Sequence, residues 1–179
     1  MEIGVISDSH GDQESVLLAA KCLIEEKQVK TIIHLGDDYE DARLLEAYSV
    51  KIINVPGVYS DYYQDPCIPN RLIKTFRGWK TLISHTIKSH YADLDGDLVP
   101  EVIIVKRRAR VVLYGHTHIP AIEEKDGVLY FNPGHLRIGD KRGHQPTYGL
   151  IDFEKDKITA RIFYLNENKE LYCNTFTGE

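Results

Sequence analysis

The first segment of the chain, Ile3-Gly4-Val5-Ile6, constrains the fold most, because it is apolar and stops abruptly at a polar motif. Its length and β-branched residues are typical of a short buried strand, and Ser7-Asp8-Ser9-His10-Gly11 follows it. In an extended segment residues i and i+2 project to the same side, so Asp8 and His10 can reach one cation. Oxygen and nitrogen ligands suit Mn, Fe, Zn, Co or Ni. The alternative is an ordinary turn in which Asp8 or Asp12 caps the following helix.

The same pattern recurs in the next part of the chain. Apolar residues at helical spacing over residues 12–27 predict a helix, and residues 31–35 predict a second buried strand. That strand ends at Gly36-Asp37-Asp38. Because such crossovers are right-handed and join parallel strands, Asp37 should emerge at the same edge of one sheet as the Asp8 and His10 pair.

A third unit leads into an irregular loop rich in tyrosine. A short helix over residues 41–48 and a strand over 51–55 are predicted, and this strand ends at Pro56-Gly57. Residues 58–69 show neither helical nor strand periodicity, and we expect an ordered loop at the mouth of the site. Its aromatic side chains could stack on a nucleobase or an aryl ester, or they could cover the core or form a subunit contact. They are Tyr59, Tyr62 and Tyr63.

Two further predicted strands also end in histidine. Strands over residues 71–76 and 81–84 surround a turn, and the second of them ends at His85. The clearest β segment, residues 111–114, ends in Gly115-His116-Thr117-His118, where the argument from i and i+2 applies again. Polar motifs thus end four strands that we predict to be successive members of one parallel set. Coincidence is the weaker explanation.

A helix is predicted over residues 98–107, buried on most sides, with Asp97 as its N-cap and Pro100 in its first turn. The basic run Lys106-Arg107-Arg108 falls where this helix should end. Cations are favoured there in any case, so a solvated helix terminus is preferred over a phosphate site.

From Ala121 onward the pattern changes to a β meander. Turns are expected at Asp126-Gly127 and near Lys155-Asp156. Strands are expected near residues 128–131, 148–153, 158–165 and 171–176. The alternation after Thr147 suggests a second sheet that packs on the first.

Length and composition indicate one domain, residues 1–179, of an ordinary soluble class, with 42% hydrophobic and 27% charged residues. No apolar run approaches a membrane span and the N-terminus leads directly into a strand, so we expect a cytoplasmic protein without a membrane partner. The three cysteines, Cys22, Cys67 and Cys173, are widely separated, and we expect reduced, mostly buried thiols.

The formal net charge of −5 disfavours binding to duplex nucleic acid. Small anionic substrates remain compatible if metals supply positive charge.

Taken together, the motifs resemble those of the calcineurin-like metallophosphoesterase superfamily, and most of all its small bacterial and archaeal phosphodiesterases. The family's blocks Asp-x-His, Gly-Asp, Gly-Asn, His and Gly-His-x-His correspond, in order, to Asp8-Ser9-His10, Gly36-Asp37, Gly57-Val58, His85 and Gly115-His116-Thr117-His118. The resemblance covers nearly the whole chain and includes Asn132-Pro133-Gly134. It implies an α/β fold, a two-sheet β sandwich flanked by helices in four layers, αββα.

The resemblance also implies a ligand set and a reaction. Ligands of one metal would be Asp8, His10, Asp37 and His118, and those of a second would be Asp37, His85 and His116, with Asp37 as the bridge. Asp37, His85 and His116 would also be the catalytic residues. The cofactors would be two divalent transition-metal ions, with manganese expected first and nickel, iron, zinc or cobalt as alternatives. The expected reaction is hydrolysis of small phosphate esters by a hydroxide activated between the two metals.

The third block departs from the family pattern. Val58 replaces the asparagine that would be a ligand of the second metal and a donor to the phosphate, and it can do neither. Two roles are open for Asp61, which lies one residue beyond the usual spacing. Asp61 would be the structural acid of this loop, or it would turn inward as a substitute ligand. With three protein ligands left, the second ion should bind more weakly than the first.

Other polar residues have weaker assignments. His34, inside an apolar strand, is expected to be a hydrogen-bonded structural histidine and not a ligand. His90 and His135 could protonate a leaving group. Arg137, Lys141 and Arg142 could hold a substrate phosphate, although solvated loop charges explain them equally well, and His144 has no assigned role.

Two other classes of function compete with a phosphoesterase. A non-catalytic interaction scaffold could use the same fold, but the presence of all three histidine blocks and both aspartates favours an enzyme. A nucleotide-binding regulator without hydrolysis would need a Gly-rich phosphate loop at a helix start, which this sequence does not show. A homo-oligomer is compatible with the sequence.

Overall fold

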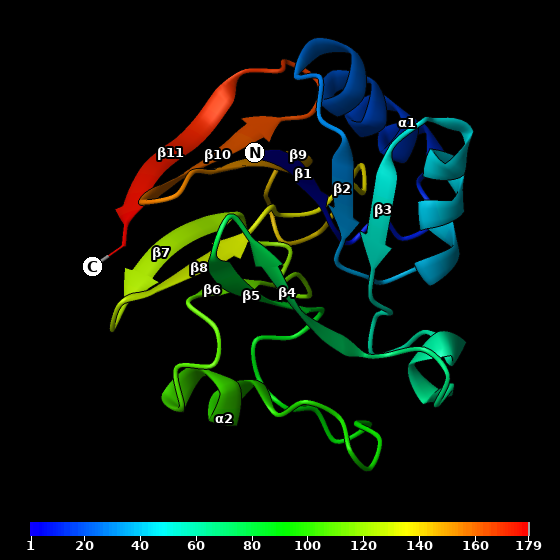
Figure 1. The fold of residues 1–179 in the computed structure, drawn as a ribbon. Helices are drawn as coiled ribbons and strands as arrows, with labels where there is room; N and C mark the ends of the chain where they lie inside the picture. The colour runs from blue at the N-terminus through cyan, green and yellow to red at the C-terminus, as the bar shows by residue number, and fades with distance from the viewer. Residues whose placement is uncertain (179) are drawn as a thin grey trace.

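The computed structural model describes residues 1–178 and contains two mixed β-sheets (Figure 1). The first sheet has six strands in the order β11 (Glu170–Thr177), β10 (Lys157–Tyr164), β9 (Thr147–Phe153), β1 (Glu2–Ile6), β2 (Thr31–His34) and β3 (Lys51–Asn54). The second has five in the order β4 (Arg71–Phe76), β5 (Trp79–Ser84), β6 (Val111–Leu113), β8 (Val128–Asn132) and β7 (Ala121–Lys125). The predicted two-sheet architecture is confirmed.

The helices are short. Helix α1 (Gln13–Lys21) continues into a π-helical segment, η1 (Cys22–Glu26), and Asp12 caps it by accepting a hydrogen bond from the Ser15 amide. Two 3₁₀ segments, η2 (Tyr39–Ala47) and η3 (Asp61–Gln64), and helix α2 (Pro100–Val105) complete the set. The cap is therefore Asp12, one of the two residues considered for it, and Asp8 is left for another role.

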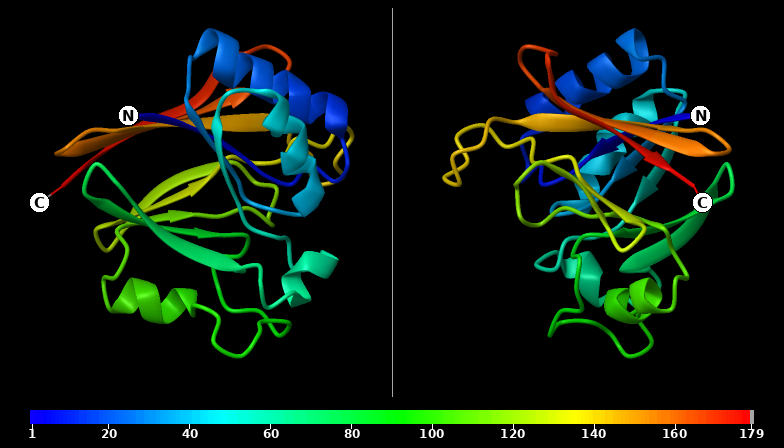
Figure 2. Two further views of the ribbon diagram at one scale, coloured as in Figure 1. Left: turned by 45° about the vertical axis from the view of Figure 1, so that its right-hand side comes forward. Right: turned by 90° about the vertical axis from the view of Figure 1, so that its left-hand side faces the viewer.

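The two sheets face each other and enclose the main core, as the two views of Figure 2 show. Both inner faces contribute fully buried side chains, among them Ile151 and Phe153 from the first sheet and Leu113 and Phe131 from the second. Burial of such side chains contributes roughly 1.5–3 kcal/mol each, so this interface is the main source of stability.

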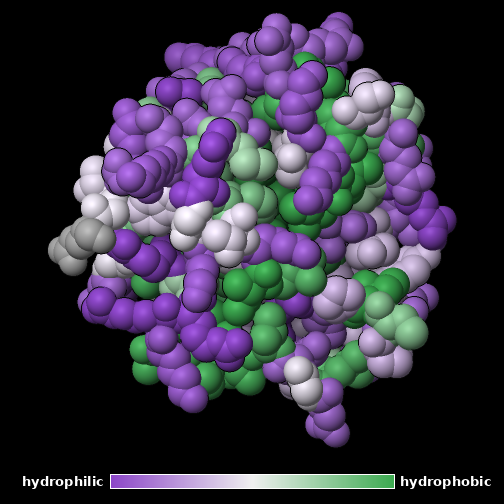
Figure 3. All heavy atoms as spheres, viewed as in Figure 1, coloured by the Kyte–Doolittle hydropathy of each residue, from purple (hydrophilic) through white to green (hydrophobic). Residues whose placement is uncertain are grey.

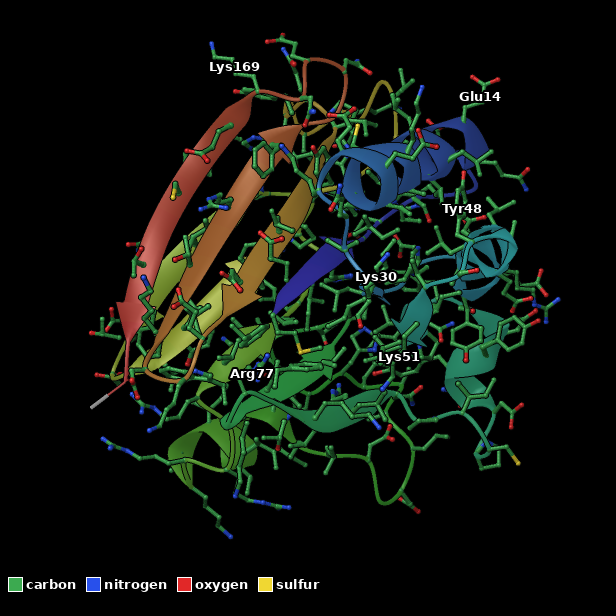
Figure 4. The ribbon with its side chains drawn as sticks, turned by 45° about the horizontal axis from the view of Figure 1, so that its top comes forward. Glu14, Lys30, Tyr48, Lys51, Arg77 and Lys169 are labelled. Carbon is green, nitrogen blue, oxygen red and sulfur yellow. The ribbon has the colours of Figure 1, made fainter. Side chains whose placement is uncertain are left out.

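The outer faces are covered unequally. Helix α1 packs its buried residues Val16, Ala19 and Ala20 on the first sheet, and α2 packs Ile103 on the second. Most of β11 is exposed, and no helix lies over β10 and β11 in Figure 4, where Glu14 marks α1 and Lys169 marks the start of β11. The helical layers therefore cover only part of each sheet.

The assignment of strands to sheets differs from the prediction. The strands after Thr147 do not form a second sheet, because β9 pairs antiparallel with β1 and extends the first sheet. The second sheet is built from the middle of the chain, where β5, β6 and β8 are parallel neighbours. Histidine motifs after β5 and β6 consequently come from a different sheet than the aspartate motifs after β1 and β2. The prediction of one parallel set was wrong.

Helix α2 also differs from the prediction. Val99 is the residue before the helix, whereas Asp97 accepts hydrogen bonds from Leu94 and Asn70. The helix is not buried on most sides, since Val105 is 82% exposed, and hydrophobic atoms show at the lower left of Figure 3, over α2. The helix packs on the outer face of the sheet, so only the side of the helix that faces the sheet is buried. In a helix of six residues this side contains two buried residues, Pro100 and Ile103.

No helix within residues 1–178 has the length and hydrophobicity required to cross a membrane. All three cysteines are free. Cys22 is buried, but Cys67 and Cys173 are exposed, so the expectation of mostly buried thiols holds for one of them only.

Candidate metal centre

Four strand ends meet at one edge of the sandwich. The segments after β1 and β2 are joined by a hydrogen bond from the Asp8 amide to the Gly36 carbonyl, at 3.0 Å. The segments after β5 and β6 are joined in the same way, from the Gly115 amide to the His85 carbonyl, also at 3.0 Å. These bonds continue the parallel pairing beyond the strands and bring both pairs of motifs to the same end of their sheets.

The backbone at these strand ends is unusual. Ten non-glycine residues among the described ones have positive φ, and five of them are predicted ligands, with φ between 49° and 66°. These five are Asp8, His10, Asp37, His116 and His118. Left-handed backbone is uncommon for such residues, and it tends to gather at functional sites where the surrounding structure enforces it. The chain therefore turns sharply wherever it delivers one of these side chains.

Two glycines allow the motifs to approach one another. A Cβ on Gly115 would lie 2.0 Å from Ser7 Oγ and 2.6 Å from Asp8 Oδ2, and a Cβ on Gly57 would lie 2.4 Å from the Cα of Asp37. Both distances are far below van der Waals contact. The glycines of the Gly-His-x-His and Gly-Val motifs are needed because neighbouring backbone and carboxylate groups fill the space of a side chain.

The first predicted ligand set is gathered in the structure. One ligand atom from each side chain lies within 4.8 Å of the others. His10 Nε2 is 2.7 Å from Asp37 Oδ2 and 3.0 Å from His118 Nε2, which is itself 3.3 Å from Asp8 Oδ1. Ligands bound to a zinc-like ion at about 2.0–2.2 Å lie about 3–3.5 Å from each other. The spacings of 3.0 and 3.3 Å suit one shared cation, whereas the 2.7 Å between His10 and Asp37 is shorter than such an arrangement requires. The members are Asp8, His10, Asp37 and His118.

The donor set fits a cation because its atoms do not satisfy one another. Asp37 Oδ2 is buried and has no hydrogen-bond partner, although His10 Nε2 is close to it. Burial opposes ionisation of Asp37, yet the neighbouring imidazoles of His10 and His85 lower its pKa below the ordinary value. A buried carboxylate that stays ionised calls for positive charge nearby, which these imidazoles or a bound cation can supply.

The second predicted set is only partly gathered. Asp37 Oδ1 lies 3.4 Å from His85 Nε2, which is 3.3 Å from His116 Nδ1. Within residues 1–178, neither ring nitrogen of His116 lies within 4.0 Å of an Asp37 carboxylate oxygen, unlike those of His10, His85 and His118. His85 Nδ1 donates to the Leu35 carbonyl at 2.8 Å, and its Nε2 faces Asp37. Burial and the neighbouring His85 both lower the pKa of His116, so a neutral imidazole is favoured at His116.

Asp140 is a member of the site that the sequence analysis missed. Its Oδ2 lies 2.6 Å from His118 Nδ1, and Asp140 and His118 have side chains that are only 5% and 4% exposed. Burial alone would raise the pKa of Asp140, but hydrogen bonds from the Arg142 amide and from His118 lower it to about 2. Asp140 lies in an irregular loop and follows no strand, so no pattern in the sequence marks it.

Val58 is buried and Asp61 is exposed. Asp61 is the first residue of η3, and within the described part of the chain its carboxylate forms no hydrogen bond or ion pair. Neither of the two roles expected for Asp61 is seen. The second set of ligands therefore receives no carboxylate from this loop.

The tyrosine loop contributes one residue to the mouth of the site. The Tyr59 ring is 75% exposed, and its centroid lies 6.4 Å from that of His116 and 6.1 Å from that of His90. Tyr62 donates a hydrogen bond to Glu40, and Tyr63 is buried. Tyr63 therefore covers the core, which was one of the alternatives for this segment, and does not border the mouth.

His34 is confirmed as a hydrogen-bonded structural residue. It is fully buried, contacts Ser9 Oγ through Nε2 and accepts from the Gly36 amide through Nδ1. Burial lowers its pKa to about 4, so it is neutral near pH 7. By these contacts it holds the backbone of the motifs that follow β1 and β2.

The remaining candidates divide between the two sides of the site. His90 lies beside Tyr59, whereas His135 is fully buried and its ring centroid lies 5.3 Å from that of His118.

Asn132 donates hydrogen bonds to the Gly115 carbonyl and to Thr117 Oγ1, both at 3.0 Å. The Asn-Pro-Gly motif thus holds the turn that carries His116 and His118.

Comparison with known proteins is consistent with this geometry. A family model described as the calcineurin-like phosphoesterase superfamily domain matches residues 1–156. The probable metallophosphoesterase YsnB of Bacillus subtilis is 30% identical over 166 residues, which cover 91% of this chain and 90% of that protein. The phosphodiesterase MJ0936 of Methanocaldococcus jannaschii is 29% identical over 162 residues, covering 87% of this chain and 95% of that protein.

Solved structures share the fold. The phosphoesterase Yfce of Escherichia coli has a TM-score of 0.73 at 19% identity, with 99% of this chain and 100% of that chain covered. Vps29 of Chaetomium thermophilum has the same TM-score at 17% identity, with both chains fully covered. The fold alone therefore does not distinguish an esterase from a protein named for vacuolar sorting.

Proposed function

The chain belongs to the calcineurin-like phosphoesterase superfamily, and from this premise we propose that it is a metal-dependent phosphodiesterase that hydrolyses small phosphate esters. The convergence of four ligand atoms from two carboxylates and two imidazoles carries the proposal. The unpartnered Asp37 Oδ2 at their centre supports a cation as the missing partner.

Each predicted ligand has a defined part in this proposal. The first ion would be held by Asp8, His10, Asp37 and His118, and the second by Asp37, His85 and His116. Divalent ions at these positions supply Lewis-acid activation of water and stabilise negative charge on the phosphate. Mixed oxygen and nitrogen donors suit manganese first, and nickel, iron, zinc or cobalt as alternatives. The three catalytic residues are Asp37, His85 and His116.

The chain's own residues must bind and orient the ester. Tyr59 and His90 stand on the side of His116, where an organic group of the ester can lie against aromatic faces. On the side of His118, a surface hollow of about 430 Å³ is lined by Arg137, Lys141 and Arg142 together with Asp140. The net charge of −5 favours a small ester over a nucleic-acid duplex.

Hydrolysis assays on metal-stripped protein test this proposal. A chromogenic phosphodiester and the matching monoester are offered after reconstitution with Mn, Ni, Zn or Mg separately. We expect no hydrolysis without metal, recovery with at least one transition metal, and preference for the diester. Equal rates in stripped and reconstituted protein would contradict the proposal.

Asp37→Ala should cause the largest loss, because this carboxylate faces both ligand sets. We expect activity to fall by about three orders of magnitude, which corresponds to about 4 kcal/mol of lost transition-state stabilisation. Asp38→Ala is the matched control, since the adjacent acid is exposed. Activity that survives in Asp37→Ala would exclude a mechanism that uses two metals.

A non-catalytic interaction scaffold is the second candidate, and Val58 is the observation that favours it. This residue leaves the second set one ligand short of the family pattern, and the fold also occurs in proteins named for vacuolar sorting. Binding of metal without hydrolysis of any ester offered would favour the scaffold.

A cytoplasmic location is proposed as well. It is supported by three free cysteines, two of them exposed, because exposed thiols persist in a reducing compartment. Detection of a disulfide between native chains would contradict it.

A further inference from the structure

The contact between Asp140 and His118 decides which nitrogen of His118 carries the hydrogen. Asp140 Oδ2 lies 2.6 Å from Nδ1, within hydrogen-bond range. An ionised carboxylate can only accept, so Nδ1 of His118 donates. In the neutral ring Nε2 then keeps its lone pair, and Nε2 is the atom that lies 3.0 Å from His10 Nε2 and 3.3 Å from Asp8 Oδ1.

Asp140 is itself held in place. Its Oδ1 accepts from the Arg142 amide at 2.8 Å, and the Arg142 guanidinium lies 3.5 Å from Oδ2. The loop before it is attached to the first motif, because the Leu136 amide donates to the Asp8 carbonyl and the Ile138 amide to Asp12 Oδ2. These hydrogen bonds fix the loop, and with it the position of the Asp140 carboxylate.

A separate cation among His118, Asp140 and His135 is the competing interpretation of this cluster. Potential ligand atoms of these residues do lie within 4.8 Å of one another, and His135 Nδ1 is buried without a hydrogen-bond partner. However, His118 would then have to offer both ring nitrogens as lone pairs, one to each group. The 2.6 Å contact is explained by a hydrogen bond without that requirement.

We propose that Asp140 is a positioning residue for the metal centre, which fixes His118 in the Nδ1–H tautomer and aims its Nε2 at the first ion. This inference rests on the proposed function. A carboxylate that orients a ligating histidine in this way typically changes metal affinity about 10- to 100-fold. Without Asp140, the ring can take the Nε2–H tautomer and donate to Asp8, and that proton must leave before His118 can bind a cation.

Two measurements on the full chain test the inference. Zinc binding to metal-stripped protein is measured by calorimetry, and the tautomer of His118 is read from the ring nitrogen chemical shifts in the metal-free state, at a pH high enough for the ring to be neutral. We expect Asp140→Ala to weaken zinc at the tighter site about 10- to 100-fold and to move the hydrogen of His118 toward Nε2. Asp140→Asn keeps the shape and one acceptor oxygen, so its affinity should fall between wild type and Asp140→Ala.

Two controls separate this role from a general effect on the loop or on charge. Ile138→Ala removes an exposed side chain of the same loop but keeps the amide that donates to Asp12, and Asp126→Asn removes one exposed acidic charge in another turn. Both should bind zinc within about twofold of wild type. Wild-type zinc affinity in both Asp140 variants, or a His118 that carries its hydrogen on Nε2 in the wild-type protein, would overturn the inference alone. A wild-type protein that binds no divalent metal would overturn the proposed function and this inference together.

Discussion

Val58 occupies the position at which the family resemblance predicts an amide ligand. Its side chain is apolar and buried, and Asp61, the nearest acid considered as a substitute, is exposed. The second ion would thus keep Asp37, His85 and His116 as its protein ligands, whereas the first keeps four. Fewer protein ligands leave more positions for water, so affinity should differ between the two ions.

Metal titration should therefore resolve one tight ion and a distinctly weaker one. Val58→Asn restores an amide oxygen and should tighten the weaker ion about 10-fold or more, with the tight one unchanged. Asp61→Ala is the matched control within the same loop and should change neither ion. Two equally tight ions in the wild-type protein would show that the missing asparagine costs nothing.

Tyr59 is the one tyrosine of its loop that lies beside His116. If its face supports an aromatic group of the ester, Tyr59→Ala should raise KM for an aryl phosphodiester about 5- to 10-fold and leave an alkyl diester unchanged, since stacking contributes roughly 1–3 kcal/mol per ring. Tyr62→Ala serves as control, because Tyr62 contacts Glu40 instead. Equal KM values for both esters in Tyr59→Ala would favour a role in packing or subunit contact.

At the scale of elements, a buried arginine fixes the long segment between β5 and α2. The Arg71 guanidinium donates to the Leu98 carbonyl at 3.1 Å, to Thr86 Oγ1 at 3.2 Å and to Asp93 Oδ1 at 2.8 Å. Tyr63 also donates to Asp93, at 2.5 Å. This network holds the segment that carries His90, and it explains why Tyr63 is buried instead of lining the mouth.

Asp93→Asn should reveal the stability of that network through its dependence on pH. Burial opposes ionisation of Asp93, but hydrogen bonds from Arg71 and Tyr63 lower its pKa below the ordinary 3.8. A lowered pKa stabilises the folded state above the unfolded value, and this contribution is lost as pH falls through the folded value. The wild type should exceed Asp93→Asn by about 1–3 kcal/mol in unfolding free energy near pH 7, and the gap should narrow below about pH 4.

Denaturant unfolding at a series of pH values provides this measurement. Asp95→Asn is the matched control, because that acid lies two residues away and is exposed. A gap between wild type and Asp93→Asn that stays constant from pH 7 to pH 3 would argue against an ionised Asp93 in the network.

At the scale of the whole molecule, the site exists only where the two sheets meet. His10 and His118 are separated by 108 positions in the sequence, yet their Nε2 atoms lie 3.0 Å apart. The motif after β6 reaches the motif after β1 across the sandwich, and the Asp8 carboxylate accepts from the His116 amide at 3.0 Å. The distance between sheets at this edge therefore controls the geometry of the proposed metal centre.

Gly115→Ala should disturb that distance. Its added Cβ would lie 2.0 Å from Ser7 Oγ, and relief of such overpacking typically costs about 1–3 kcal/mol of stability. We also expect weaker binding of the first ion, because the shift separates the motif of His118 from that of Asp8. Gly127→Ala is the control, strained by a φ of 71° but without any atom within 4 Å of its added Cβ. Wild-type metal affinity in Gly115→Ala would contradict this account.

Local pattern was enough to predict most strands and to single out the six residues that are proposed as ligands. Short apolar runs with β-branched residues predict β1, β2 and β6, because a buried strand must be apolar along its length. The polar motifs are recognisable because they end these apolar runs. The family resemblance added the division of ligands between two ions, which remains a proposal here. His34 as a structural residue also followed from local chemistry, which for the cap of α1 left Asp8 and Asp12 as alternatives.

Only the tertiary structure decided which sheet each strand joins and which distant groups reach the site. The pairing of β9 with β1 connects opposite ends of the chain, and strand periodicity is the same whichever partner a strand takes. Asp140 lies in an irregular loop and becomes significant only because packing brings it to His118 Nδ1. Tyr59 and Tyr63 are four residues apart and chemically identical, yet Tyr63 is buried in its contacts with Arg71 and Asp93, whereas Tyr59 is exposed. Sequence determined the segments and their chemistry, because these depend on neighbours along the chain, whereas the composition of the site depends on neighbours in space.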